Sequence, residues 1–232
     1  MYLRLLIYYS LIFLALCLVI ISLINPDLII EQYQYFSDKY LIKTGSDTPE
    51  PNSTSETTSD QSKVNLNDNF SAPMSNFRSR VTKKFFGTYV DPSHSPVSPE
   101  KFTGFHNAVD LETFPDEENL DVSVNAICTG KLAINRTASG YGGLVAQYCT
   151  LDGSPVLVLY GHMDIDSVVF KLGDDISSGT KIGILGQPGP ETDGERKHLH
   201  LGIRKGQELV ILGYVPTEAG LSNYIDPLLV IK

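Results

Sequence analysis

The feature that most constrains the fold is a series of short apolar segments in the C-terminal part of the chain. Each is as long as a strand, rich in β-branched or aromatic residues, and bounded by turn residues, which is typical of β-strands. None shows a sustained 3.6-residue apolar period. The segments are 123–134, 143–150, 155–163, 180–186 and 198–206. We therefore predict a mainly β, antiparallel domain over residues 70–232, long enough to bury a core.

The N-terminus carries an uncharged apolar run over residues 5–24, LLIYYSLIFLALCLVIISLI. A helix of that length, at about 1.5 Å per residue, spans a hydrocarbon core of roughly 30 Å. Arg4 precedes the run and acidic residues follow it, which places the N-terminus in the cytoplasm and the remainder outside. We predict a transmembrane anchor over residues 1–25, and a single-pass protein of the cell membrane whose C-terminal domain is extracytoplasmic.

A cleaved signal peptide is the alternative to this anchor. No small-x-small site closes the run, which ends in SLINPD, and the run is long for a signal peptide. A lipoprotein signal at Cys17 is disfavoured because the bulky Leu16 precedes it. Residues 26–69 follow as a juxtamembrane segment and a linker, whose stretch 44–68 is rich in Ser, Thr, Asp and Pro and predicts disorder.

Charge and cysteine usage exclude two classes of function. The formal net charge is −9 and the 18 basic residues form no long run, whereas binding nucleic acid needs clustered Lys and Arg. The three cysteines lack the CxxC spacing of a structural zinc site. Cys128 and Cys149 fall in two strand-like segments that could be neighbours. A disulfide and a pair of buried free thiols both remain open.

Two histidine motifs could supply metal ligands. His106 lies four residues before Asp110 in FHNAVD. In an extended strand these positions are about 13 Å apart, so the backbone must turn between them if both bind one metal. His198 and His200 alternate in KHLHLG and project from one face of a strand. Each motif alone is weak, since surface histidines and half-buried strands give the same patterns.

The remaining two histidines differ in their surroundings. His162 follows an apolar segment that Gly161 ends or bends, which also suits a histidine at a strand end. His94 lies in a Pro/Ser-rich segment and is expected to be exposed and unrelated to any site.

Taken together and in this order, the motifs FHNAVD, SGYGG, YGHMD, KIGILG and HLHLGI resemble those of the LytM/lysostaphin-type zinc endopeptidases. The upstream KKFFGTYVDP is similar to the segment before that family's first histidine, so the resemblance covers about residues 70–232. The resemblance implies an antiparallel β-sheet sandwich of the LytM/lysostaphin type.

The resemblance also implies roles for five residues. His106, Asp110 and His200 match the three ligands of a Zn²⁺ cofactor, and His162 and His198 match the pair that acts on the metal-bound water. Three protein ligands with an open fourth position suit catalytic zinc. The implied substrate is a peptide bond in the stem peptides or cross-bridges of peptidoglycan.

The chain departs from the family pattern around the site. The loop 187–197 is longer and more charged than the family's short turn, and we expect it to border the substrate groove. The acidic segment 116–121 is similarly extended, and we expect it to influence substrate choice. Some relatives keep a tyrosine near the first histidine, whereas the nearby aromatic residues here are Phe102 and Phe105.

Three functions are compatible with these motifs. The favoured one is a membrane-anchored zinc metalloendopeptidase acting on peptidoglycan, because all five matching positions are present. The second is a non-catalytic relative that binds and activates another cell-wall hydrolase. The third is a plain secreted β domain whose histidines coincide with the motifs by chance.

Overall fold

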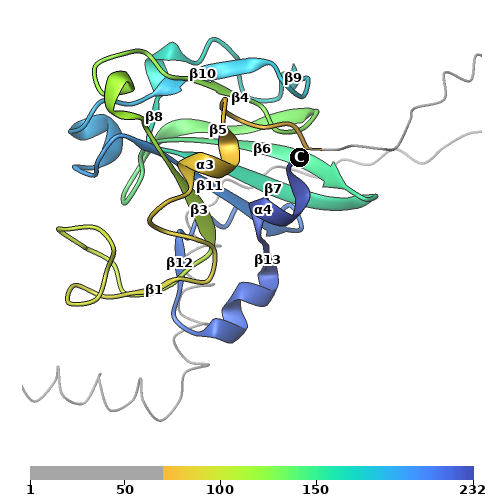
Figure 1. Cartoon of the computed structure of the whole chain (residues 1–232). Helices are drawn as coiled ribbons and strands as arrows, with labels where there is room; N and C mark the ends of the chain where they lie inside the picture. The colour runs from red at the N-terminus through yellow and green to blue at the C-terminus, as the bar shows by residue number, and fades with distance from the viewer. Residues whose placement is uncertain (1–69) are drawn as a thin grey trace, which may run out of the picture. The chain divides into compact units, whose positions relative to one another are not determined.

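The computed structural model describes residues 70–232, and these form the mainly β, antiparallel domain predicted from the sequence (Figure 1). The predicted anchor over 1–25 and the linker over 26–69 lie outside the described residues. Within 70–232, no helix is long and apolar enough to cross a bilayer.

The largest sheet has the strand order β13-β11-β7-β6-β5-β9, and β3 also pairs with β11. All of its strand pairs are antiparallel. Its members are β3 (Ala108–Glu112), β5 (Gly130–Ala138), β6 (Gly142–Leu151), β7 (Ser154–Gly161), β9 (Asp175–Ile176), β11 (His198–Lys205) and β13 (Tyr224–Ile225).

Two three-stranded sheets accompany it, with the orders β4-β10-β8 and β1-β2-β12. Their strands are β1 (Tyr89–Val90), β2 (Gly104–His106), β4 (Ser123–Asn125), β8 (Met163–Asp164), β10 (Lys181–Leu185) and β12 (Tyr214–Val215). The helical segments are short: α3 (Phe77–Arg80), α4 (Pro227–Val230), η1 (Pro115–Glu117), η2 (Ile165–Ser167), η3 (Pro190–Thr192) and η4 (Glu218–Asn223).

Two of the predicted strands are each divided in the structure. The segment 123–134 becomes β4 and β5, which belong to different sheets and are separated by residues 126–129. The segment 155–163 is interrupted at His162, whose φ of 63° is left-handed and incompatible with a continuing strand. Because of these breaks, each of the two segments contributes strands to two different sheets.

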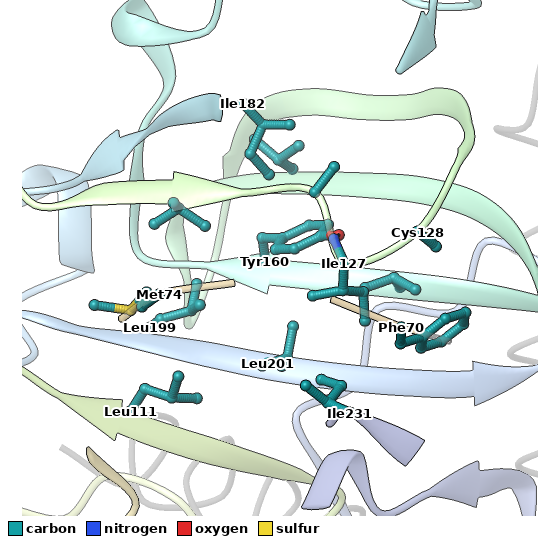
Figure 2. Close-up of a cluster of buried hydrophobic side chains, with 14 of the residues drawn as sticks. Phe70, Met74, Leu111, Ile127, Cys128, Tyr160, Ile182, Leu199, Leu201 and Ile231 are labelled. Atoms are coloured by element: carbon teal, nitrogen blue, oxygen red, sulfur yellow. The ribbon is translucent and has the colours of Figure 1, made fainter. Parts of the chain in front are cut away.

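The main core lies between the large sheet and the β4-β10-β8 sheet (Figure 2). Alternate residues of β3, β7 and β11 face this core, including Leu111, Tyr160, Leu199 and Leu201, all of which are buried. Because side chains alternate across a strand, the residues between them must point to the opposite face. That opposite face carries Asp110, His198 and His200.

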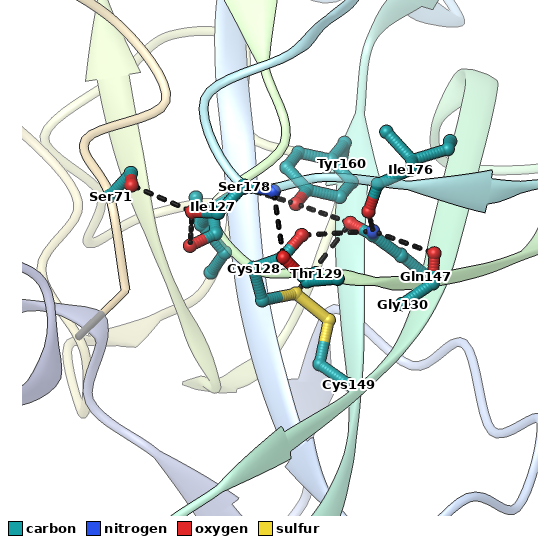
Figure 3. Close-up of a disulfide and its surroundings, with 10 residues drawn as sticks. All are labelled: Ser71, Ile127, Cys128, Thr129, Gly130, Gln147, Cys149, Tyr160, Ile176 and Ser178. Carbon is teal, nitrogen blue, oxygen red and sulfur yellow. Dashed lines mark hydrogen bonds between the residues drawn. A yellow bond between two sulfur atoms is a disulfide. The ribbon is translucent and has the colours of Figure 1, made fainter. Parts of the chain in front are cut away.

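A buried polar cluster around Gln147 joins β6 to β5 and β9 (Figure 3). The Gln147 amide donates to the carbonyls of Cys128, Gly130 and Ile176 at 3.0, 3.2 and 3.1 Å. Cys128 and Cys149 form a disulfide with a Cα–Cα distance of 6.1 Å. The structure therefore decides the question that the sequence left open in favour of the bonded pair.

Replacing both cysteines by alanine is expected to lower the free energy of unfolding by roughly 3 kcal/mol, because the bond closes a loop of 21 residues in the unfolded chain. Urea unfolding of the full chain with and without reductant measures this. The Cys128→Ala/Cys149→Ala variant serves as control and should not respond to reductant. Equal unfolding midpoints of the wild type in both conditions would contradict the expectation.

Candidate metal centre

A change of sheet between β2 and β3 brings the first motif together. His106 ends β2 and Asp110 lies in β3, and Asn107 between them belongs to neither strand. The Asn107 side chain donates to the Leu212 carbonyl at 2.7 Å, which fixes this corner. His106 Nε2 consequently lies 3.2 Å from Asp110 Oδ1. The predicted turn between the two residues is therefore present.

The pairing of β3 with β11 brings in the second motif. His200 lies directly opposite Asp110, and His198 lies opposite Glu112. His200 Nδ1 is 3.3 Å from Asp110 Oδ1 and 3.2 Å from His106 Nε2. One ligand atom from each of His106, Asp110 and His200 lies within 4.8 Å of the other two, and all three residues are buried.

His162 reaches the same place from the end of β7. The strand ends at Gly161, which lies opposite His200. A Cβ at Gly161 would lie 2.5 Å from the Tyr141 ring and 3.1 Å from the His200 Cβ, so only glycine fits there. The left-handed backbone at His162 then turns its ring to 4.3 Å from that of His198. The structure thus gathers all five residues singled out from the sequence.

Backbone carbonyls fix the protons on two of the imidazoles. His106 Nδ1 lies 3.3 Å from the Phe85 carbonyl, and His198 Nδ1 lies 2.8 Å from the Arg196 carbonyl. A carbonyl only accepts, so both Nδ1 atoms carry the proton and donate it. The Nε2 atoms of His106 and His198 face Asp110.

Burial and neighbouring charges set the ionisation of the cluster. Burial raises the pKa of Asp110, but the adjacent His198 and His106 outweigh it and hold that pKa well below its usual range. Burial lowers the pKa of His200 to about 4. Burial, together with the neighbouring His198 and His200, also lowers the pKa of His162 well below its usual range. At neutral pH Asp110 is thus a carboxylate, and His162 and His200 are neutral imidazoles.

These donors fit a zinc ion. Neutral imidazole nitrogens and a carboxylate oxygen are zinc ligands, and three protein ligands leave a position open. Asp110 Oδ1 and His200 Nε2 are buried without a hydrogen-bond partner, which is unusual for buried polar atoms. A metal ion held by His106, Asp110 and His200 would satisfy the carboxylate oxygen.

A cavity of about 210 Å³ opens onto the cluster and is lined by Asp110, His162, His198 and His200. Its other walls come from elements far apart in the sequence: Lys84, Phe102, Ser139, Gly140, Tyr141, Glu195, Ile211, Leu212, Gly213 and Tyr214. The cluster therefore lies at the bottom of an accessible cleft.

Two tyrosines that line this cleft were not singled out from the sequence. Tyr141 belongs to the SGYGG motif, where it could have been noticed, and its ring packs 5.3 Å from that of His200. Tyr214 carries no sequence signal; it reaches the cleft because β12 pairs with β2, which puts it opposite His106. The Tyr214 hydroxyl accepts a hydrogen bond from Lys84 Nζ at 2.8 Å, and Lys84 is paired with Glu100 at 2.7 Å.

The two extended loops behave differently. The loop 187–197 borders the cleft through Glu195, as expected, and is fastened by a hydrogen bond of 2.6 Å from Lys101 Nζ to the Asp193 carbonyl. The acidic segment 116–121, which was expected to influence substrate choice, does not line the cleft. Glu117 of this segment forms an ion pair with Arg80, and backbone carbonyls of the segment accept hydrogen bonds from Lys197 Nζ. These contacts hold the segment away from the site.

His94 is exposed and contacts only Asp91 among ionisable groups of the described residues, at 3.1 Å. This agrees with the expectation that it is unrelated to the site.

Comparison with known proteins gives one family match. Residues 104–211 match the profile described as "Peptidase family M23". The matched segment contains His106, Asp110, His162, His198 and His200. No curated protein sequence matches the chain.

Several solved structures are similar at low identity. The catalytic domain of lysostaphin from Staphylococcus simulans is 21% identical, over 68% of this chain and 96% of that one, with a TM-score of 0.45. Csd3 from Helicobacter pylori is 19% identical over 70% of this chain, with a TM-score of 0.44; the match spans only 34% of Csd3. A chain of the SpoIIQ–SpoIIIAH pore-forming complex is 18% identical, over 71% of this chain and 92% of that one, with a TM-score of 0.48.

Acidification is expected to destabilise the metal-free protein through His200. The unfolded chain protonates this residue near its ordinary pKa of 6.5, whereas the folded protein does so only near 4. Between these values the unfolded state binds more protons, so stability present above pH 6.5 is lost as the pH falls toward 4. At pH 5 the loss from His200 should reach about 2 kcal/mol.

Urea unfolding of the full chain in chelator at pH 7 and pH 5 measures this loss. His200→Asn should show a shallower dependence on pH than the wild type, and His94→Asn, at an exposed position, should keep the wild-type dependence. A His200→Asn variant that loses as much stability as the wild type would show that another group is responsible.

Proposed function

Residues 104–211 belong to peptidase family M23, and from that membership we propose that the chain is a zinc-dependent endopeptidase that hydrolyses peptide bonds of peptidoglycan. The observation that carries the proposal is the buried cluster of His106, Asp110 and His200 at the bottom of a cleft. His162 and His198 line the same cleft, which gives the cluster the proton-transfer groups that a purely structural metal site does not need.

His106, Asp110 and His200 would hold the zinc ion. When bound, zinc polarises a carbonyl and lowers the pKa of a coordinated water to about 7. The remaining chemistry falls to the protein's own side chains, and the substrate peptide would lie along the cleft.

His198 is suited to accept the proton of the attacking water. Its Nδ1 proton is engaged with the Arg196 carbonyl, so Nε2, which faces the cluster, is the atom that would accept the proton. A base held in one tautomer by a hydrogen bond from its other nitrogen needs no reorganisation. His162, whose ring lies 4.3 Å from that of His198, would assist in the same proton transfers.

Tyr214 is suited to stabilise the negative charge that develops on the scissile carbonyl oxygen. Burial, with nearby Asp110 and Glu100, raises the pKa of this phenol, so it keeps its proton at neutral pH. Lys84 occupies one side of the phenol oxygen, which leaves the hydroxyl proton free to be donated elsewhere in the cleft. A fixed donor of this kind acts as an oxyanion hole does.

We place the domain outside the cytoplasmic membrane, held by an uncleaved anchor at residues 1–25. The uncharged run 5–24 and the charges on its two sides support this location. The disulfide between Cys128 and Cys149 is consistent with an oxidising compartment. Intact-mass measurement of the membrane fraction distinguishes the anchor from a cleaved signal peptide.

The purified full chain is expected to contain about one zinc ion and to release soluble fragments from purified peptidoglycan. His106→Ala should lose both the zinc and the fragments, because a metal ligand is missing. His94→Ala is the matched control and should keep both.

The result also separates the competing functions. Purified wild-type protein that is folded but contains no zinc would contradict the proposal. A wild type that releases no fragments, yet accelerates another cell-wall hydrolase, would favour the non-catalytic activator.

Tyr214→Phe is expected to lower kcat on a soluble peptidoglycan peptide by roughly 100-fold, because one donor to the developing oxyanion is removed. KM should change little, since the ring and its packing against Phe102 remain. Steady-state kinetics measure both constants, and Tyr89→Phe, at a half-exposed position, serves as control. An unchanged kcat would remove Tyr214 from the mechanism.

A further inference from the structure

Arg196 makes a fork of hydrogen bonds beneath the metal centre. Its Nη2 donates to Asp110 Oδ2 at 2.9 Å, and its Nε contacts the two carboxylate oxygens of Glu112 at 3.0 and 2.9 Å. Asp110 and Glu112 are two apart on β3, so their side chains project from the same face. One planar guanidinium therefore bridges both carboxylates, a geometry that lysine cannot reproduce.

The two oxygens of Asp110 have different surroundings. Oδ1 faces His106 Nε2 at 3.2 Å and His200 Nδ1 at 3.3 Å. Oδ2 faces Arg196 Nη2, and His198 Nε2 at 3.3 Å. A carboxylate whose second oxygen is bonded to a fixed donor cannot rotate freely. The fork thus determines which oxygen is presented to the candidate metal position.

Arg196 also supplies the charge that the buried carboxylate lacks. The Asp110 side chain is only 2% exposed, and an unpaired carboxylate buried to this extent is strongly unfavourable. Among the lysines and arginines of residues 70–232, only Arg196 lies within ion-pair distance of Asp110. Its other partner, Glu112, is additionally paired with Lys83 at 3.0 Å.

We propose that Arg196 is a positioning residue of the metal centre: in the metal-free protein it neutralises the buried Asp110 and holds its Oδ2, so that Oδ1 faces His106 and His200. The proposal rests on the proposed zinc function. It assigns to the charged loop 187–197 a role beyond bordering the cleft. Arg196 lies two residues before His198, the first residue of β11, so the residue that holds Asp110 and the candidate base lie in the same short segment.

A structural role alone has different consequences. If Arg196 merely fastened the loop, its loss would destabilise the metal-free and zinc-loaded proteins equally. If it compensates Asp110, its loss should matter most without metal, because a bound cation takes over the compensation. Zinc then stabilises the variant more than it stabilises the wild type.

The first experiment is a double-mutant cycle in chelator, using the full chain with Arg196→Met and Asp110→Asn alone and together. Arg196→Met should lower Tm by roughly 10 °C, because an unpaired carboxylate stays buried. In the Asp110→Asn background, Arg196→Met should lower Tm by less than half as much. Arg196→Lys should recover part of the loss, and Arg136→Met, at an exposed position, is the matched control.

The second experiment repeats the Tm measurement with saturating zinc. The penalty for Arg196→Met should fall to less than half of its value in chelator. Circular dichroism establishes that each variant is folded at the starting temperature. If Arg196→Met does not fold, the cycle is carried out with Arg196→Lys.

Additive losses in the cycle, or equal losses with and without zinc, overturn the proposal. The failure of the proposed function looks different: the wild type itself then shows no rise in Tm with zinc. The cycle in chelator contains no metal, so it still decides whether Arg196 holds Asp110.

Discussion

The structure around the candidate site depends on the antiparallel register between β3 and β11. That register puts Asp110 opposite His200 and Glu112 opposite His198. A shift of β11 by one residue would turn His198 and His200 to the other face of the sheet, into the core now filled by Leu199, Leu201 and their neighbours. The same alternation that builds the hydrophobic core therefore also builds the polar cluster.

The polar cluster then imposes its own requirements on the surrounding chain. A buried carboxylate needs a cation or a set of donors, and Arg196 meets that need from the loop before β11. Tight packing beneath the cluster excludes any side chain at Gly161, because the Tyr141 ring fills the space. Lys84, which lines the cleft, forms a second ion pair with Glu100 and donates a hydrogen bond to the Tyr214 hydroxyl.

Much of the candidate site was predictable, because the placement of its histidines follows from local sequence patterns. Period-two alternation in HLHLGI fixed the relative direction of His198 and His200, and the incompatibility of an extended strand with the spacing of His106 and Asp110 required the break found at Asn107. The predicted family is also confirmed over residues 104–211. Tyr214 and Arg196 could not be found in this way, because each reaches the site through strand pairing or loop packing with distant residues. The position of the acidic segment 116–121 could not be predicted for the same reason, since its partner Arg80 lies 37 residues before Glu117.

The ligand residues are far apart in the sequence, and this has a consequence for folding. His106 and His200 are separated by 94 residues, whereas the disulfide closes a loop of only 21. A metal ion bound by both would act as a second, reversible cross-link spanning most of the domain. Because the unfolded chain lacks the site and releases the ion, the stabilisation would increase with the concentration of metal, whereas that from the covalent bond would not. Metal supply would then govern the stability of the domain, in addition to whether it can react.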